Sequence, residues 1–198
     1  MEPVHTEKYR DHNIEIFYDE CAESPRDWDN LGTMVCFHKS YNLGDEHNYK
    51  SEDYSGWQEL ENQILKDNPN CVILPIYMYD HSGITIRTYP FSCPWDSGQI
   101  GYIYCSLEKI RKEYNRKLVT KQLRAKVEEI LISEIKTCDQ YLIGDVYGYR
   151  IKNNSGEEVD SCWGCFGIEN AIKEAKETLD YLTDNGKTEI NGQLVFQM

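Results

Sequence analysis

Long apolar runs and basic side chains are scarce in this 198-residue sequence. No stretch approaches the ~18 apolar residues of a membrane-spanning helix. No apolar run follows a basic start at the N-terminus, as a secretion signal would require. We therefore expect a cytoplasmic protein without a membrane partner. Lys and Arg number 21 against 34 Asp and Glu, a formal net charge of −13, which argues against direct binding of the phosphate backbone of nucleic acid.

Sequence motifs of the common nucleotide and metal sites are also missing. The chain has no Walker loop and no Gly-x-Gly-x-x-Gly, which argues against a P-loop NTPase or a dinucleotide-binding fold. No loop has the EF-hand pattern. Cys162 and Cys165 form the only Cys-x-x-Cys, and a zinc site would want a second pair or two suitably spaced histidines. We therefore name no cofactor and no metal, and we favour reduced structural thiols for the eight cysteines.

The positive charge that is present is concentrated in one stretch. Residues 106–136 hold nine Lys and Arg against five Asp and Glu, so this stretch is net +4 and the remainder is net −17. We favour a solvated helix face in a molecule that is acidic for solubility. Two alternatives stay open: an acidic surface that imitates nucleic acid, and a basic patch that holds a phosphate or nucleotide.

Periodicity and turn signals predict an α+β fold: a mostly antiparallel sheet with three to four helices packed on it, in a single domain over residues 1–198. Residues 1–11 and 184–198 are expected to be loosely ordered, with 194–198 as a short edge strand at most. Strands are predicted at 12–18, 33–38, 71–79, 84–89, 100–105, 145–152 and 157–163. Helices are predicted at 56–67, 106–116, 120–141 and 168–183.

Six polar loops share Trp, Asp, Gly, Ser and Cys at the ends of the predicted strands. They cover residues 27–32, 42–45, 80–83, 93–99, 144–148 and 160–164. Glycine lets backbone approach closely, Asp turns the chain and can act as acid, base or ligand, and Trp offers a flat stacking surface. If the loops converge at one sheet edge, they form an aromatic-walled acidic pocket for a polar or cationic group. The alternative is ordinary turn chemistry with Trp in the core.

This pocket defines the candidate ligand-binding residues. The three tryptophans would supply stacking surfaces, and the aspartates would supply polar anchors. The full candidate set is Trp28, Asp29, Asn30, Trp95, Asp96, Ser97, Asp145 and Trp163.

A hydrolase is the rival interpretation. Its candidate catalytic residues are Asp96 or Cys93, acting with His81 or with a bound divalent ion. Asp96-Ser97-Gly98 has the Asp-Ser/Thr-Gly form of aspartic peptidases, but those need two such carboxylates, from two lobes or a dimer. Spacing alone selects no Cys–His pair. We therefore favour binding over catalysis.

Three long motifs resemble those of a family of small acidic phage and mobile-element proteins. They read ESPRDWDNLGTMVCFH at 23–38, PFSCPWDSGQIG at 90–101 and DSCWG at 160–164. The resemblance spans nearly the whole chain and carries no catalytic residue across. It implies a protein of the host cell cytoplasm encoded by a virus or mobile element. Small acidic proteins of that origin frequently inhibit host or defence machinery, which is association and not chemistry.

The leading hypothesis is therefore a binding protein that inhibits or sequesters a host or defence protein, or a small polar ligand, through the Trp/Asp/Gly loops. The alternatives are a metal- or carboxylate/Cys-dependent hydrolase and an acidic inhibitor that mimics nucleic acid. A homo-oligomer is compatible with each of them.

Overall fold

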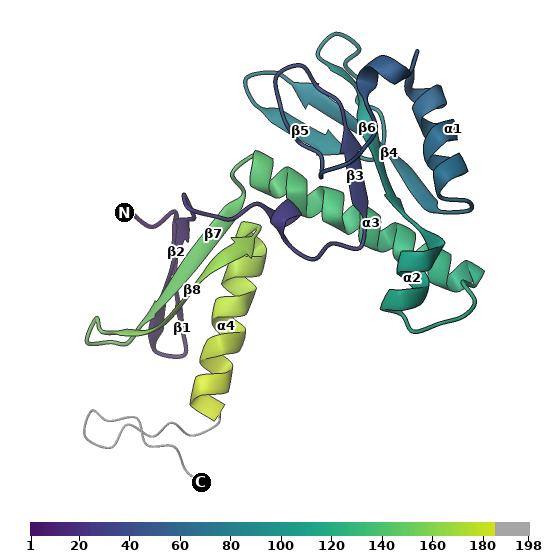
Figure 1. Ribbon diagram of the computed structural model, residues 1–198. Helices are drawn as coiled ribbons and strands as arrows, with labels where there is room; N and C mark the ends of the chain where they lie inside the picture. The colour runs from purple at the N-terminus through teal and green to yellow at the C-terminus, as the bar shows by residue number, and fades with distance from the viewer. Residues whose placement is uncertain (185–198) are drawn as a thin grey trace. The chain divides into compact units, whose positions relative to one another are not determined.

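The chain forms two compact units in a computed structural model that describes residues 1–184 (Figure 1). The first, here called the terminal unit, combines Met1–Glu23 with the described part of Gly144–Met198. The second, the central unit, is Ser24–Ile143. The central unit is thus inserted between two strands that are neighbours in the sheet of the terminal unit.

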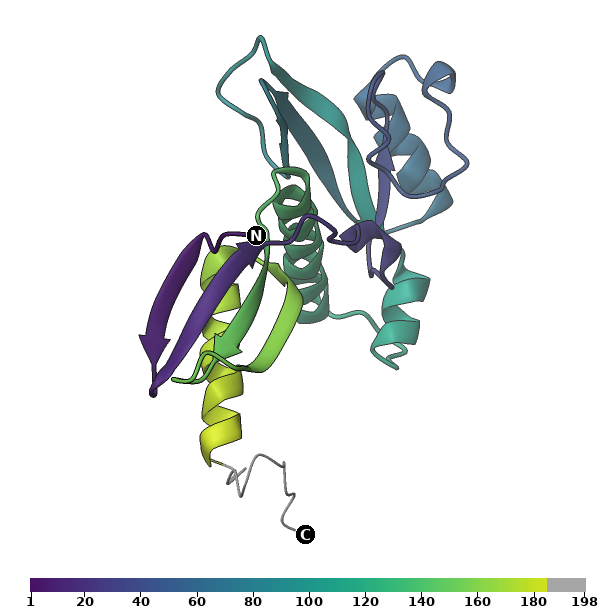
Figure 2. The ribbon, with the colours of Figure 1, turned by 90° about the vertical axis from the view of Figure 1, so that its left-hand side faces the viewer.

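The terminal unit is a four-stranded antiparallel sheet with one helix on it. Its strands β1 (His5–Tyr9), β2 (His12–Tyr18), β7 (Val146–Lys152) and β8 (Glu158–Phe166) lie in the order β1-β2-β7-β8. Helix α4 (Ile168–Asp184) runs along one face, as Figure 2 shows. The core between them consists of Ile14, Ile16, Tyr147, Tyr149, Ile151, Cys165, Ala171, Ala175 and Leu179.

The central unit holds a second antiparallel sheet and three helices. Strands β3 (Thr33–Cys36), β4 (Val72–Asp80), β5 (Ile84–Arg87) and β6 (Ser97–Cys105) lie in the order β3-β6-β4-β5. The helices are α1 (Trp57–Asp67), α2 (Leu107–Glu113) and α3 (Lys121–Leu142). Two 3-10 turns, η1 (Pro25–Asp27) and η2 (Ser51–Asp53), lie in the loops on either side of β3.

Helices cover both faces of this sheet, and the alternation along β6 shows why. Ile103 faces α3 and packs in a core with Leu131, whereas its neighbour Tyr102 faces α1 and packs with Leu60. A strand buried on both faces reads as a nearly continuous apolar run, as β6 does. Glycine is needed at position 101, where β3 pairs with β6, because a Cβ there would lie 1.9 Å from the carbonyl oxygen of Val35.

The predicted α+β class, the antiparallel pairing and the four helices are confirmed. The strands form two sheets, one in each unit, where we expected one. The expectation that residues 1–11 are loosely ordered is wrong, since β1 pairs with β2 from His5↔Ile16 to Tyr9↔His12. Of residues 184–198 only Asp184, the end of α4, is described, so the predicted strand at 194–198 lies outside the described part. Among residues 1–184, each helix is too short or too polar to cross a bilayer.

Candidate functional site

An arginine with a largely buried side chain organises the first of the predicted loops, residues 27–32. Arg26 donates from Nε and Nη2 to both carboxylate oxygens of Asp45, at 2.9 and 2.5 Å, and from Nη1 to Glu134 at 3.1 Å. Only 9% of the Arg26 side chain is exposed. The bidentate fork to Asp45 is the strong form of an Arg–carboxylate pair. Through Asp45 and Glu134 together, Arg26 connects η1, the loop after β3 and helix α3.

The two carboxylates also hold the backbone of the loop. Glu134 accepts hydrogen bonds from the amides of Leu31 at 2.7 Å and Gly32 at 3.1 Å. Asp45 accepts one from the amide of Met34 at 2.7 Å. These oxygens satisfy backbone donors that would otherwise be left unpaired beside the core. Asp45 and Glu134 therefore maintain the loop and have little capacity left for a ligand.

Three predicted ligand-binding residues line a pocket at this loop. Trp28, Asp29 and Asn30 border a cavity of about 500 Å³, together with Lys109 of α2. The Lys109 ammonium donates to the carbonyl oxygen of Asn30 at 2.6 Å. Trp28 is 49% exposed, so about half of this residue contacts solvent. The pocket is polar, and we call this region the Trp28 loop.

The predicted loop at residues 93–99, where β6 begins at Ser97, exposes its tryptophan far more. Trp95 is 91% exposed, yet its loop is held by local hydrogen bonds. Asp96 accepts a hydrogen bond on its carbonyl oxygen from the amide of Asp80 at 2.8 Å, and the Ser97 hydroxyl donates to the carbonyl oxygen of Cys93. We call this region the Trp95 loop. Its geometry is fixed while its largest side chain contacts solvent.

The candidate catalytic residues do come together beside the Trp95 loop. His81 Nδ1 lies 3.3 Å from Asp96 Oδ2, and the Cys93 thiol donates to the same oxygen at 3.8 Å. In a nucleophile–base–orienter arrangement the histidine contacts the nucleophile. Here the carboxylate lies between thiol and imidazole, and the His81 side chain is mostly exposed. The cluster therefore does not have the order of a Cys–His–Asp triad.

Aromatic rings lie beside this cluster, and one arginine stacks on two of them. The Arg87 guanidinium carbon lies 3.7 Å from the ring centroid of Phe91 and 4.1 Å from that of Tyr89. Tyr79 stacks on Phe91 and on His81, at centroid distances of 5.7 and 5.9 Å. Arg87 also donates to the carbonyl oxygens of Tyr89 and Pro90 at 3.0 and 2.6 Å. We call Tyr79, His81, Tyr89, Phe91 and Trp95, with Arg87, the aromatic end of the central unit.

A cavity of about 390 Å³ adjoins the aromatic end. Arg87, Tyr89 and Phe91 form one wall, and Ile132 and Lys136 of α3 form the other. One wall is aromatic, Arg87 and Lys136 place one cation on each wall, and Asp139, which accepts hydrogen bonds from Thr85 and the Ile86 amide, also lines the cavity. Such a cavity can accept one protruding side chain, with an acidic or polar end toward the two cations.

The two tryptophan loops of the central unit lie at opposite ends of its sheet. Thr33, next to the Trp28 loop, pairs with Tyr104 near the end of β6. The Trp95 loop runs into Ser97 at the start of β6. Tyr104 is seven positions after Ser97, so the two residues lie roughly 23 Å apart along the strand at about 3.3 Å per position. Within the central unit the predicted loops therefore do not form one pocket.

The last two predicted ligand-binding residues belong to the terminal unit. Trp163 lies flat over Gly148, where a Cβ would be 2.1 Å from its ring, and 6.2 Å from the Phe17 centroid. Its ring therefore covers the face of the sheet opposite α4. Burial and then a hydrogen bond with Asp145 raise the pKa of Tyr147 to about 12. Both Trp163 and Asp145 have a structural use within their own unit.

Comparison with protein-family models, with curated proteins and with solved structures finds no match for this chain. The resemblance to phage and mobile-element proteins therefore rests on the motifs alone. Sequence reasoning missed Arg26, Glu134 and Lys109, which hold the Trp28 loop, whereas Asp45 falls in the predicted loop at 42–45. A sequence signal existed for one of them, because Glu134 interrupts the apolar stripe of α3 between Leu131 and Cys138.

Proposed function

We propose that this chain is a cytoplasmic binding protein of a virus or mobile element, that it inhibits a host or defence protein, and that its contact surface is the aromatic end of the central unit. The observation that supports this most is the 91% exposure of Trp95 on a loop fixed by hydrogen bonds. A fold gains nothing from a tryptophan in water, whereas an interface gains a great deal from burying one.

The energetics favour a macromolecular partner at this surface. Burying a tryptophan removes roughly 150–250 Å² of surface from water, worth up to about 4–6 kcal/mol at 25 cal/mol per Å². Tyr89 is also exposed, and Trp, Tyr and Arg are the residue types that dominate measured interface energies. Because the loop is already ordered, binding loses little further conformational entropy.

Charge and cavity indicate the chemistry of the partner. A net charge of −13 favours association with a protein that has a basic surface, and it accelerates the encounter at low salt. The cavity between Arg87 and Lys136 would receive one acidic or polar side chain of that partner. A small ligand in the Trp28 pocket is less favoured, because the Asp45 carboxylate already holds Arg26 and a backbone amide.

The test compares Trp95→Ala with the matched variant Trp28→Ala. Proteins captured from bacterial lysate by the wild-type chain are identified, and the Kd for the purified partner is measured for each variant. We expect Trp95→Ala to weaken binding roughly 30-fold or more, the ~2 kcal/mol of an interface hot spot, and to leave thermal unfolding within ~0.5 kcal/mol of wild type.

Three results would contradict this proposal. One is wild-type affinity in Trp95→Ala. Another is selective loss of affinity in Trp28→Ala, which would move the contact surface to the Trp28 loop. The third is affinity that falls steeply with salt and ignores both tryptophans, which would favour an acidic mimic of nucleic acid.

A hydrolase at Cys93, Asp96 and His81 is the second candidate. It is favoured because Cys93 and His81 both contact the same carboxylate oxygen of Asp96. It requires turnover of an ester or amide substrate that Asp96→Asn abolishes while binding is kept. Turnover unchanged in Asp96→Asn, or absent from the wild-type chain over a panel of such substrates, would remove this candidate.

A further inference from the structure

A β-bulge places two cysteines of β8 on the same face of the terminal sheet. Cys165 pairs with Tyr147 and Cys162 with Tyr149, so two residues of β8 lie opposite a single residue of β7. Residues three apart on a regular strand point to opposite faces. The extra residue of the bulge shifts the alternation by one, so here they point to the same face. Gly164 adopts φ +79° at the bulge, a conformation that glycine adopts without strain. Both thiols therefore face α4.

The bulge is fixed from outside the Cys-x-x-Cys segment. The amide of Gly164 donates to the carboxylate of Asp19 at 3.0 Å. This hydrogen bond satisfies a backbone donor that the bulge removes from the ladder. The two thiols are thus held in place by the backbone.

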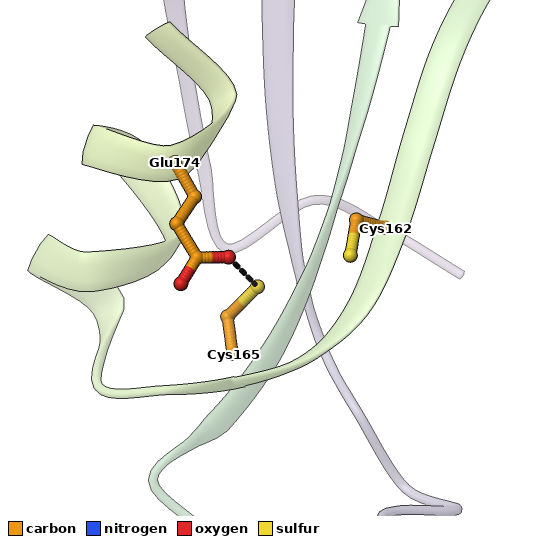
Figure 3. A group of neighbouring side chains, drawn as sticks. All are labelled: Cys162, Cys165 and Glu174. Atoms are coloured by element: carbon orange, nitrogen blue, oxygen red, sulfur yellow. Dashed lines mark hydrogen bonds between the residues drawn. The ribbon is translucent and has the colours of Figure 1, made fainter. Parts of the chain in front are cut away.

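A glutamate from the helix completes the group (Figure 3). Glu174 Oε2 lies 3.3 Å from Cys165 Sγ, and one donor atom from each of Cys162, Cys165 and Glu174 lies within 4.8 Å of the other two. Asn170 donates to the other oxygen, Glu174 Oε1, at 2.8 Å. This bond orients the carboxylate, as outer partners of metal ligands do.

We propose that Cys162, Cys165 and Glu174 bind one borderline-soft divalent cation of the Zn²⁺ class. With Zn–S near 2.3 Å and Zn–O near 2.0 Å, tetrahedral geometry puts two sulfur ligands about 3.8 Å apart and a sulfur and an oxygen about 3.5 Å apart. The observed 3.3 Å and the 4.8 Å limit require only small side-chain rotations. Two thiolates and a carboxylate select Zn²⁺ over Mg²⁺ or Ca²⁺.

Burial and charge agree with this assignment. Cys162 is exposed, so it does not serve as a core hydrophobe, whereas Cys165 is buried. Among residues 1–184, Glu174 accepts hydrogen bonds from Asn170 and Cys165 and forms no ion pair with Lys or Arg. A bound cation supplies that positive charge. Three protein ligands leave a fourth position for water or for a donor atom of another molecule.

The bound cation would cross-link an edge strand to a helix, because its ligands come from both. β8 is at the edge of its sheet, and α4 follows it after one residue. A cation that binds only the folded chain stabilises it by mass action, so Tm rises with the concentration of free Zn²⁺. This inference is independent of the proposed binding surface in the central unit.

The experiment uses the full chain, reduced and stripped of metal with a chelator, and Co²⁺ as the probe. We expect one Co²⁺ per chain, with a sulfur-to-cobalt charge-transfer band in the near ultraviolet and tetrahedral bands in the visible, all displaced by Zn²⁺. Cys162→Ser should lose about half of the charge-transfer intensity. Glu174→Gln should weaken Zn²⁺ binding roughly 10- to 100-fold. The matched controls Cys21→Ser and Glu177→Gln should bind as the wild-type chain does.

Several results would overturn the metal site. They are absence of the charge-transfer band in the reduced wild-type chain, a full-intensity band in Cys162→Ser, and a Tm that Zn²⁺ does not raise. A fourth is a Cys162–Cys165 disulfide in protein purified without air, seen as an intact mass lower by two hydrogens. Because Cys162 is exposed, its variant should fold, and circular dichroism of each variant verifies this.

Discussion

The Trp28 loop and the Trp95 loop use nearly the same residue types for different purposes. At the Trp28 loop, Arg26 points inward and bridges two carboxylates with 9% of its side chain exposed, whereas Asp27 and Asp29 are exposed. At the Trp95 loop, the arginine stacks on rings at the surface and the tryptophan is 91% exposed. The comparison teaches that a Trp-Asp-Gly pattern does not tell a loop that maintains the fold from a loop available to a partner.

The sharpest test of this difference replaces the arginine beside each loop, Arg26 and Arg87. Arg26→Met leaves Asp45 and Glu134 without their cation, and removing one partner of a buried ion pair costs about 3–5 kcal/mol. Arg87→Met removes stacking and two hydrogen bonds at the surface, which we expect to cost roughly 1 kcal/mol. Urea unfolding measures both. Equal losses for the two variants would show that the loops are held in the same way.

Alkaline pH should destabilise the core behind the Trp28 loop. Burial raises the pKa of the Cys138 thiol to about 11 from the usual 9.0, and burial likewise raises that of Cys36, with Cys138 and Asp45 adding to the effect. The unfolded chain therefore loses these protons first. The stability contributed by the neutral Cys138 thiol is complete below pH 9 and is lost as pH rises from 9 to 11.

The expected slope is up to about 1.4 kcal/mol per pH unit for each buried thiol. Urea unfolding of the reduced chain at several pH values across this window measures it. Cys138→Ala should have a shallower slope than the wild-type chain, whereas the exposed-site control Cys21→Ser should keep it. A wild-type stability that stays level from pH 9 to pH 11 would refute the prediction.

A smaller difference in stability is expected between alanine substitutions at the glycines of the two loops, Gly32 and Gly98. A Cβ at Gly32 would lie 2.6 Å from core methyl groups of both Ile103 and Leu131, so Gly32→Ala should cost about 1–3 kcal/mol through overpacking. A Cβ at Gly98 meets nothing within 4 Å, and Gly98→Ala should change stability by less than ~0.5 kcal/mol. Thermal unfolding compares them. A tolerated Gly32→Ala would mean that the Trp28 loop can move away from the core.

Much of the secondary structure could be predicted because it is local. The apolar spacing of Val127, Leu131 and Ile135 identifies α3, and the turn at 80–83 identifies the hairpin of β4 and β5. β1 was missed for an equally local reason. It is short and largely polar, and its hairpin turn uses Arg10 and Asp11 at positive φ, where a glycine would have signalled the turn.

The candidate site was predicted only in part. The sequence offers Asp96 or Cys93, acting with His81 or a divalent ion, as alternatives, and the three side chains lie together because the hairpin turn and the start of β6 are adjacent in the sheet. Glu174 could not be found from the Cys-x-x-Cys spacing, because its place beside Cys165 depends on how α4 packs on the sheet. A search for a second cysteine pair or for histidines as zinc ligands does not include a carboxylate from a helix.

The sequence by itself determined the α+β class, the helices, the hairpins and the acidic charge, because each depends on residue type and on spacing over a few positions. Only the tertiary structure decided which loops are neighbours. The antiparallel pairing of β3 with β6 places the two tryptophan loops at opposite ends of one sheet, and the bulge at Gly164 turns two cysteines to one face. Both outcomes depend on pairings between distant segments, whose register is set by burial of whole faces and not by local preference.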